Sequence, residues 1–172
     1  MPILPREPAF YPEDLLTAEP AESLRNWLAI YTKARQEKAI ARELFELQIP
    51  FYLPLVERTQ LRRGRRIKSQ SPLFAGYVFL FADEEERLRC LQTNRVSRVL
   101  PVDDQTRLLR DLRQVQYLID SRATLTVESR LGPGDPVRVR TGPFMGMEGI
   151  VDSRRGKYRL IVVVHFLQQG VC

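Results

Sequence analysis

Five cationic side chains surround one glycine between residues 61 and 68 of this chain. They are Arg62, Arg63, Arg65, Arg66 and Lys68. An arginine guanidinium donates two parallel hydrogen bonds to a phosphate, whatever the base sequence of the nucleic acid. Gly64 favours a turn between two strand-like arms, so the pattern predicts a β-hairpin whose tip contacts nucleic-acid phosphates. The alternative is a solvated hairpin whose charge serves solubility.

The same cluster dominates the charge of the whole chain. The 172 residues carry a formal net charge of +6, and the cluster leaves +1 for all other residues together. A basic balance favours polyanionic partners such as nucleic acid. Lys33 and Arg35 lie where the first predicted strand enters its helix and would extend the nucleic-acid surface, although surface helices commonly carry such charges.

The residue types that catalysis and metal binding require are scarce. The one histidine, His165, has no ligand partner nearby, and Cys90 and Cys172 are far apart in the sequence. The sequence shows neither a Ser/His/Asp arrangement nor a glycine-rich phosphate loop after a strand. We therefore expect no enzyme, metal ion, cofactor or disulfide.

Composition and hydropathy indicate a globular protein of the reducing cytoplasm. With 44% hydrophobic and 28% charged residues, the chain can form one or two small cores. Its first residues lack the apolar segment of a signal peptide, and no apolar run approaches the ~20 residues of a membrane span. We expect a cytoplasmic monomer without a membrane partner.

Hydrophobic patterning predicts an α+β domain over residues 25–120. Apolar runs predict strands at 27–31, 51–56, 77–81 and 96–102, and helical spacing predicts helices at 34–48, from 83 onwards and at 106–120. The run 77–81 is apolar on both faces, which is typical of a central strand. With one strand of the basic hairpin included, the order is β-α-β-β-β-α-β-α, typical of helices packed on a sheet. Residues 1–24 are rich in proline and are expected to form an irregular leader. The alternative is that part of it packs, since Phe10 and Tyr11 are aromatic.

A different pattern begins at Gly132, after a predicted linker at 121–131. Glycines recur at short intervals, Val137–Arg140 alternates with period two, and Tyr158–Val164 is rich in β-branched residues. Short strands with glycine and proline turns indicate a small all-β barrel over 132–172.

Three stretches carry a resemblance to a known family. Residues 134–151, GDPVRVRTGPFMGMEGIV, resemble the KOW motif, whereas 26–47 and 71–81 resemble the first strand, the first helix and the Phe-x-Gly-Tyr strand of the NGN domain. In this order the chain resembles the NusG/RfaH family of transcription elongation factors over 25–172. The number of residues between Trp27 and Tyr77 resembles that in the specialised RfaH-like members more than that in housekeeping NusG.

The resemblance implies an NGN-type α/β sandwich followed by a small KOW barrel. The family would still supply a last strand where this chain stops at Cys172, so the barrel is expected to be short by a strand or truncated. RfaH carries DNA-contacting basic residues where Glu43 and Glu46 stand here, so base-specific recognition is not expected. The KOW segment of RfaH can also fold as a helical hairpin. Ile161–Val164 is β-branched, however, and favours the strand form.

The resemblance also implies that the NGN-like domain docks on RNA polymerase and increases processivity, while the KOW domain recruits a partner such as ribosomal protein S10 or Rho. The implied polymerase-binding residues are apolar and aromatic side chains flanking the sheet: Tyr31, Phe51, Tyr52, Leu53, Phe74 and Tyr77. Each could instead belong to the core. Tyr52 and Tyr77 are the strongest candidates, because a phenol prefers a site with one hydrated edge.

A loop of the KOW-like segment supplies the candidate partner surface. Phe144, Met145 and Met147 are apolar residues in a glycine-flanked turn, which suits an adaptable protein contact. The alternative is a cap over the open end of the barrel.

A second function remains open for the whole chain, that of a KOW-type RNA-binding protein acting on ribosomal or leader RNA.

Overall fold

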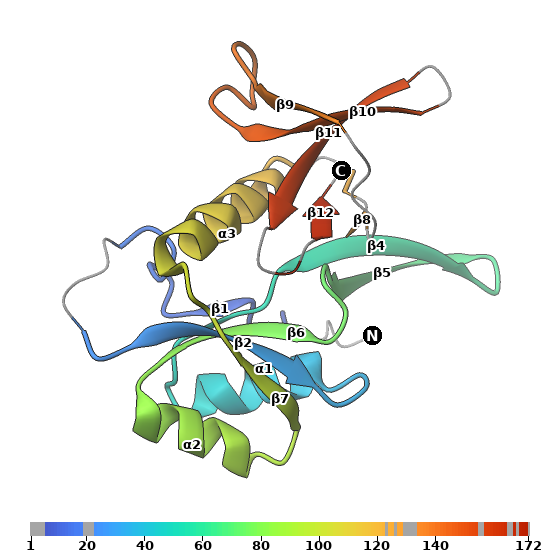
Figure 1. Ribbon diagram of the computed structural model, residues 1–172. Helices are drawn as coiled ribbons and strands as arrows, with labels where there is room; N and C mark the ends of the chain where they lie inside the picture. The colour runs from blue at the N-terminus through green and yellow to red at the C-terminus, as the bar shows by residue number, and fades with distance from the viewer. Residues whose placement is uncertain are drawn as a thin grey trace. The chain divides into compact units, whose positions relative to one another are not determined.

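The computed structural model describes residues 6–18, 23–122, 124–125, 127–128, 134–154, 157–164, 167 and 169–171 (Figure 1). The chain divides into two units, residues 1–103 and 104–172. Among the described residues, no helix is long and apolar enough to cross a membrane.

An antiparallel sheet of five strands forms the centre of the first unit. Its strands, in spatial order, are β1 (Phe10–Tyr11), β3 (Phe51–Tyr52), β6 (Tyr77–Ala82), β2 (Asn26–Thr32) and β7 (Val96–Pro101). The run that is apolar on both faces is β6, and it lies inside the sheet between β3 and β2. The prediction of a central strand is therefore confirmed.

The two faces of this sheet differ in the kind of apolar side chain that they carry. One face is aliphatic and is covered by α1 (Glu37–Glu46) and α2 (Glu84–Gln92) (Figure 1). Ile40 and Leu44 of α1 pack there with Ile30, Val78 and Leu80 of the sheet. Because alternate residues of a strand point to opposite faces, the remaining positions form an aromatic face. It consists of Phe10, Trp27, Tyr31, Tyr52, Tyr77, Phe79 and Phe81.

The predicted irregular leader is wrong for part of residues 1–24. Phe10 and Tyr11 form strand β1 and pair with β3, and Leu15 and Leu16 are buried. The rings of Tyr11 and of Phe45 in α1 pack in a T-shaped arrangement, with their centroids 5.6 Å apart. The physical reason is that Phe10 and Tyr11 carry enough apolar surface to extend the sheet by one edge strand, as the alternative for this segment allowed.

The basic cluster lies on a two-stranded hairpin, as the sequence predicts. Strands β4 (Leu55–Arg62) and β5 (Arg65–Pro72) pair along their whole length, and the hairpin extends beyond the central sheet (Figure 1). Arg63 and Gly64 connect them with φ angles of 49° and 74°. Two consecutive positive φ angles are typical of the type I′ turn, whose twist matches that of the strands.

The second unit contains one helix and a second five-stranded sheet. The helix is α3 (Gln105–Asp120), and the strands in spatial order are β8 (Val127–Glu128), β12 (Gln169–Val171), β11 (Lys157–Val164), β10 (Glu148–Arg154) and β9 (Asp135–Arg138). All neighbours in this sheet are antiparallel.

The second unit differs from the predicted domain boundaries and from the expected absence of a last strand. Part of the predicted linker is not a linker, because β8 pairs with β12. A final strand is present before Cys172, which itself lies outside the described residues. The helix assigned to the first domain contacts β11 in the second unit. The identification of this sheet as a KOW barrel stays a prediction.

The thiol of Cys90 provides a first test of the packing of the first unit. Cys90 is 1% exposed, and burial raises its pKa to about 12. In a Cys172→Ser variant, we expect alkylation of Cys90 at pH 8 to be at least about tenfold slower in the folded than in the urea-unfolded chain, because only the thiolate reacts. Mass spectrometry of the alkylated protein measures both rates, and equal rates would contradict the packing of Cys90 in this core.

Candidate functional site

Two tyrosines of the aromatic face reach the surface at one end of the sheet. Tyr31 of β2 and Tyr77 of β6 lie directly opposite each other, with ring centroids 5.2 Å apart and planes inclined by 58°. Tyr31 is 43% exposed and Tyr77 is half-buried. Arg98 of β7 is the other cross-strand neighbour of Tyr31 and is exposed. The three side chains therefore form a row across β6, β2 and β7.

The turn before β6 supports this tyrosine pair. Gly76 adopts a φ of +84°, and a Cβ built there would lie 2.8 Å from Cε2 of Tyr31. The Gly76 amide donates to Oε1 of Glu37 at 2.7 Å, while its carbonyl accepts from the amide of Thr32 at 2.8 Å. Glu37 is buried at the start of α1. These bonds fix the turn against the helix and the strand, and the bare glycine backbone leaves room for the Tyr31 ring.

The other four residues predicted for this surface have no comparable exposure. Phe51, Tyr52 and Leu53 are each 0% exposed, and Phe74 is 1% exposed. Phe51 and Leu53 belong to the aliphatic core, whereas Tyr52 stacks on Phe79 with ring centroids 6.4 Å apart. The preference for Tyr52 is therefore not supported: its ring lies inside the packed structure and lacks a hydrated edge.

Lys33 and Arg35 lie in the loop between β2 and α1, at the Tyr31 end of the sheet. Nζ of Lys33 donates to Oδ1 of Asn94 at 3.0 Å, and Arg35 is exposed with a φ of 60°. Nearby, Nε of Arg95 donates to Glu43 Oε1 at 2.6 Å. Lys33 and Arg35 therefore lie close to Tyr31 along the chain, and their role in nucleic-acid binding stays a prediction.

The arginines predicted to bind phosphate are all exposed on the hairpin. Arg62 lies opposite Arg65 beside the turn, and Arg66 lies opposite Leu61. Lys68 forms an ion pair with Glu57 at 2.9 Å on the same face of the hairpin. Arg58, which the sequence analysis missed, is exposed on β4 and shares a face with Arg62. Its even spacing from Arg62 along a strand was the available indication.

The three apolar residues of the 142–147 loop have different environments. Met145 is 71% exposed, whereas Met147 is 5% exposed and belongs to the interior. The rings of Phe144 and of Tyr117 in α3 pack in a T-shaped arrangement, with their centroids 6.4 Å apart. The Tyr117 hydroxyl donates a hydrogen bond to the carbonyl of Pro143. Met147 therefore packs inward and Met145 is accessible, and the role of this loop in a partner contact stays a prediction.

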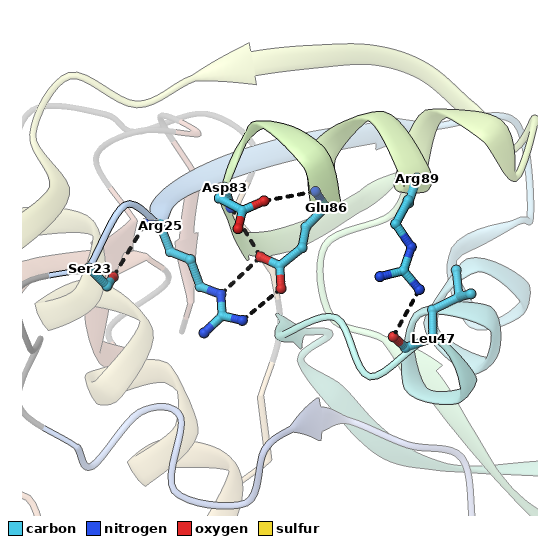
Figure 2. A network of polar contacts seen from close by, with 6 residues as sticks. All are labelled: Ser23, Arg25, Leu47, Asp83, Glu86 and Arg89. Atoms are coloured by element: carbon cyan, nitrogen blue, oxygen red, sulfur yellow. Dashed lines mark hydrogen bonds and ion pairs between the residues drawn. The ribbon is translucent and has the colours of Figure 1, made fainter.

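A polar network at the start of α2 holds the N-terminal end of β2 (Figure 2). Asp83 and Glu86 form a capping box, in which each side chain accepts from the backbone amide of the other residue. Arg25 donates to both oxygens of Glu86, at 2.9 and 2.7 Å. These hydrogen bonds from Arg25 hold the pKa of Glu86 below its ordinary value, although burial alone would raise it. The network joins α2 to the residue that precedes β2.

Known proteins are similar to most of this chain. A family model described as NusG, transcription termination factor nusG, matches residues 25–127. The transcription termination/antitermination protein NusG of Thermus thermophilus is 26% identical over 163 residues, covering 80% of this chain and 89% of the relative. The protein of the same name from Campylobacter jejuni is 26% identical over 158 residues, covering 83% and 89%. A solved structure, "Domain interaction in Thermotoga maritima NusG", has a TM-score of 0.43 at 18% identity and covers 86% and 92% of the two chains.

Proposed function

We propose that this chain, which belongs to the NusG family and is a transcription elongation and antitermination factor, docks on RNA polymerase through Tyr31 and Tyr77. The observation that carries this proposal is the position of these two rings at one end of the aromatic face, where Tyr31 is 43% exposed and Tyr77 is half-buried, whereas Trp27, Tyr52 and Phe79 of the same face are buried. The proposal retains these two of the six candidate residues, because the other four have almost no accessible surface.

The physical properties of the tyrosine pair suit a protein interface. Tyrosine combines a large apolar body with a polar hydroxyl, and it is enriched among residues that dominate binding energy. The hydrogen bonds of Gly76 hold the turn beside the pair before any partner arrives, which reduces the entropy lost on binding. A helical element with an apolar stripe would fit such an aromatic surface.

We assign supporting roles to the hairpin and to the second unit. Arg58, Arg62 and Arg65 of the β4–β5 hairpin would contact nucleic acid in the elongation complex without recognising bases. The second unit would act as a KOW domain that recruits a second partner, such as ribosomal protein S10 or Rho, with Met145 at the contact. The protein would increase processivity without catalysing a reaction, as the RfaH-like members of the family do.

Retention of purified bacterial RNA polymerase on the immobilised full chain tests the docking site. We expect Tyr31→Ala and Tyr77→Ala each to weaken polymerase binding by about tenfold or more, since truncated interface tyrosines commonly have effects of this size. Leu88→Ala is the matched control, because Leu88 is 48% exposed on α2, outside the tyrosine row. Thermal unfolding of each variant separates loss of binding from loss of fold. Unchanged polymerase binding by both folded tyrosine variants would refute the docking site.

A further inference from the structure

The register of the β4–β5 hairpin sorts its side chains onto two faces. Cross-strand partners point to the same side of a two-stranded ribbon, and successive residues of one strand point to opposite sides. The partners Arg62 and Arg65, Gln60 and Ile67, and Arg58 and Ser69 therefore share one face, which we call the cationic face. The opposite, mixed face consists of Glu57, Thr59, Leu61, Arg66, Lys68 and Gln70.

The two faces differ in charge. The cationic face carries three arginines and no acid, whereas the mixed face carries two cations and Glu57, which is paired with Lys68. The sequence alone, with its run of basic residues around Gly64, does not show this difference. It follows from the pairing of Arg62 with Arg65 across a two-residue turn.

The arginines of the cationic face have no acidic ion-pair partner among the described residues. Arg62 and Arg65 stand directly opposite each other, an arrangement in which like charges repel. Within the part of the chain that the structure describes, no carboxylate forms an ion pair with Arg58, Arg62 or Arg65. A phosphate placed between the two opposed guanidinium groups would turn this repulsion into two charge-assisted contacts.

We infer that the cationic face binds the phosphate backbone of a DNA duplex. The face has no aromatic residue to stack on unpaired bases, which favours a duplex over a single strand. The major groove of B-form DNA is ~12 Å wide and accepts a two-stranded ribbon, whereas that of A-form RNA is deep and narrow. Arg58 and Arg62 are four residues apart on one strand, so their Cα atoms are separated by about 13 Å. The face can therefore contact more than one phosphate.

This inference rests on the proposed function, because it names the ligand and the binding face of the hairpin that was assigned to nucleic acid. Its test uses free DNA without polymerase, so that its failure is distinct from failure of the Tyr31–Tyr77 docking site. The probe is a fluorescein-labelled DNA duplex of about 20 base pairs, titrated with the full chain at salt concentrations from about 50 to about 200 mM.

The decisive comparison is between two double variants that remove equal charge from opposite faces. Arg62→Gln/Arg65→Gln should weaken binding by about tenfold or more at the lowest salt and reduce the slope of log K against log salt by ~0.9, for the one phosphate that the two arginines share. Arg66→Gln/Lys68→Gln should change affinity less than about twofold, with an unchanged slope. The control is conservative, because it also releases the carboxylate of Glu57.

Three results would overturn the inference. Equal losses from the two double variants would show that net charge, and not one face, determines binding. Tighter binding of an RNA duplex of the same sequence would exclude the DNA assignment. No measurable binding of DNA by the unmodified chain would remove the hairpin's ligand while leaving the polymerase proposal intact.

Discussion

Replacing Glu86 with alanine is expected to lower the free energy of unfolding by about 2–3 kcal/mol. Glu86 is 8% exposed. Its carboxylate accepts three hydrogen bonds, two from Arg25 and one from the amide of Asp83. Alanine removes half of the capping box and leaves the Arg25 guanidinium without its partner. Because the Arg25 side chain is 41% exposed, water can solvate it again, which places the cost below that of a fully buried ion pair.

The same carboxylate makes stability depend on pH with a defined sign. The hydrogen bonds from Arg25 hold the pKa of Glu86 in the folded chain below its ordinary value of 4.5. The stabilisation is therefore complete above pH 4.5 and is lost as the pH falls through the folded-state pKa. We expect the stability difference between the unmodified chain and Glu86→Gln to shrink below pH 4.5.

Urea unfolding followed by circular dichroism, between neutral and acidic pH, measures both effects. Glu85→Ala is the matched control, because Glu85 occupies the same first turn of α2 and is exposed. Surface substitutions of this kind have little effect on stability. An equal loss of stability in Glu85→Ala and Glu86→Ala would mean that the network contributes nothing specific.

Gly76→Ala is expected to lower the free energy of unfolding by about 2 kcal/mol and to weaken polymerase binding by about tenfold. The φ of +84° is unfavourable for any L-residue with a side chain, at about 1–2 kcal/mol. The new Cβ would also lie 2.8 Å from the Tyr31 ring, far inside van der Waals contact. Since Tyr31 is 43% exposed, its ring can swing outward, and that movement separates it from Tyr77.

Gly64→Ala provides a control that isolates the displacement of the ring. Gly64 has a similar φ of +74°, yet nothing lies within 4 Å of a Cβ built there. Both variants should therefore have a lower free energy of unfolding, because alanine is unfavourable at a positive φ, and chemical unfolding measures this loss. Only Gly76→Ala should also lose retention of polymerase. A normal affinity of folded Gly76→Ala for polymerase would show that the position of Tyr31 is not important for docking.

Most regular elements of the first unit were predictable because their side chains repeat with the period of one secondary structure. The run 77–81 is uninterrupted and apolar, and a strand with both faces buried requires that pattern. Ile40 and Leu44 are one helical turn apart and pack against the sheet. Each of these features is local, so sequence spacing alone reports it.

The elements that were missed depend on partners distant in sequence. Strand β1 forms because Phe10 and Tyr11 pair with β3, about forty residues later in the chain. Strand β8 forms because Val127 and Glu128 pair with β12. The amphipathic pattern of α3 predicts a helix but does not identify the sheet that it contacts, which here includes β11. Short strands have too few residues for a period to be visible, so only tertiary pairing defines them.

Residue identity and local spacing are sufficient to predict the family of this chain, the hairpin and the basic cluster. The tertiary structure decided which residues are accessible. Tyr52 and Tyr77 are equivalent as residue types, but Tyr52 lies inside the packed sheet and Tyr77 lies at its end beside Tyr31. Similarly, strand register decided that Arg62 and Arg65 share a face from which Arg66 is excluded. Burial and register arise from contacts between segments distant in sequence, and composition carries no record of them.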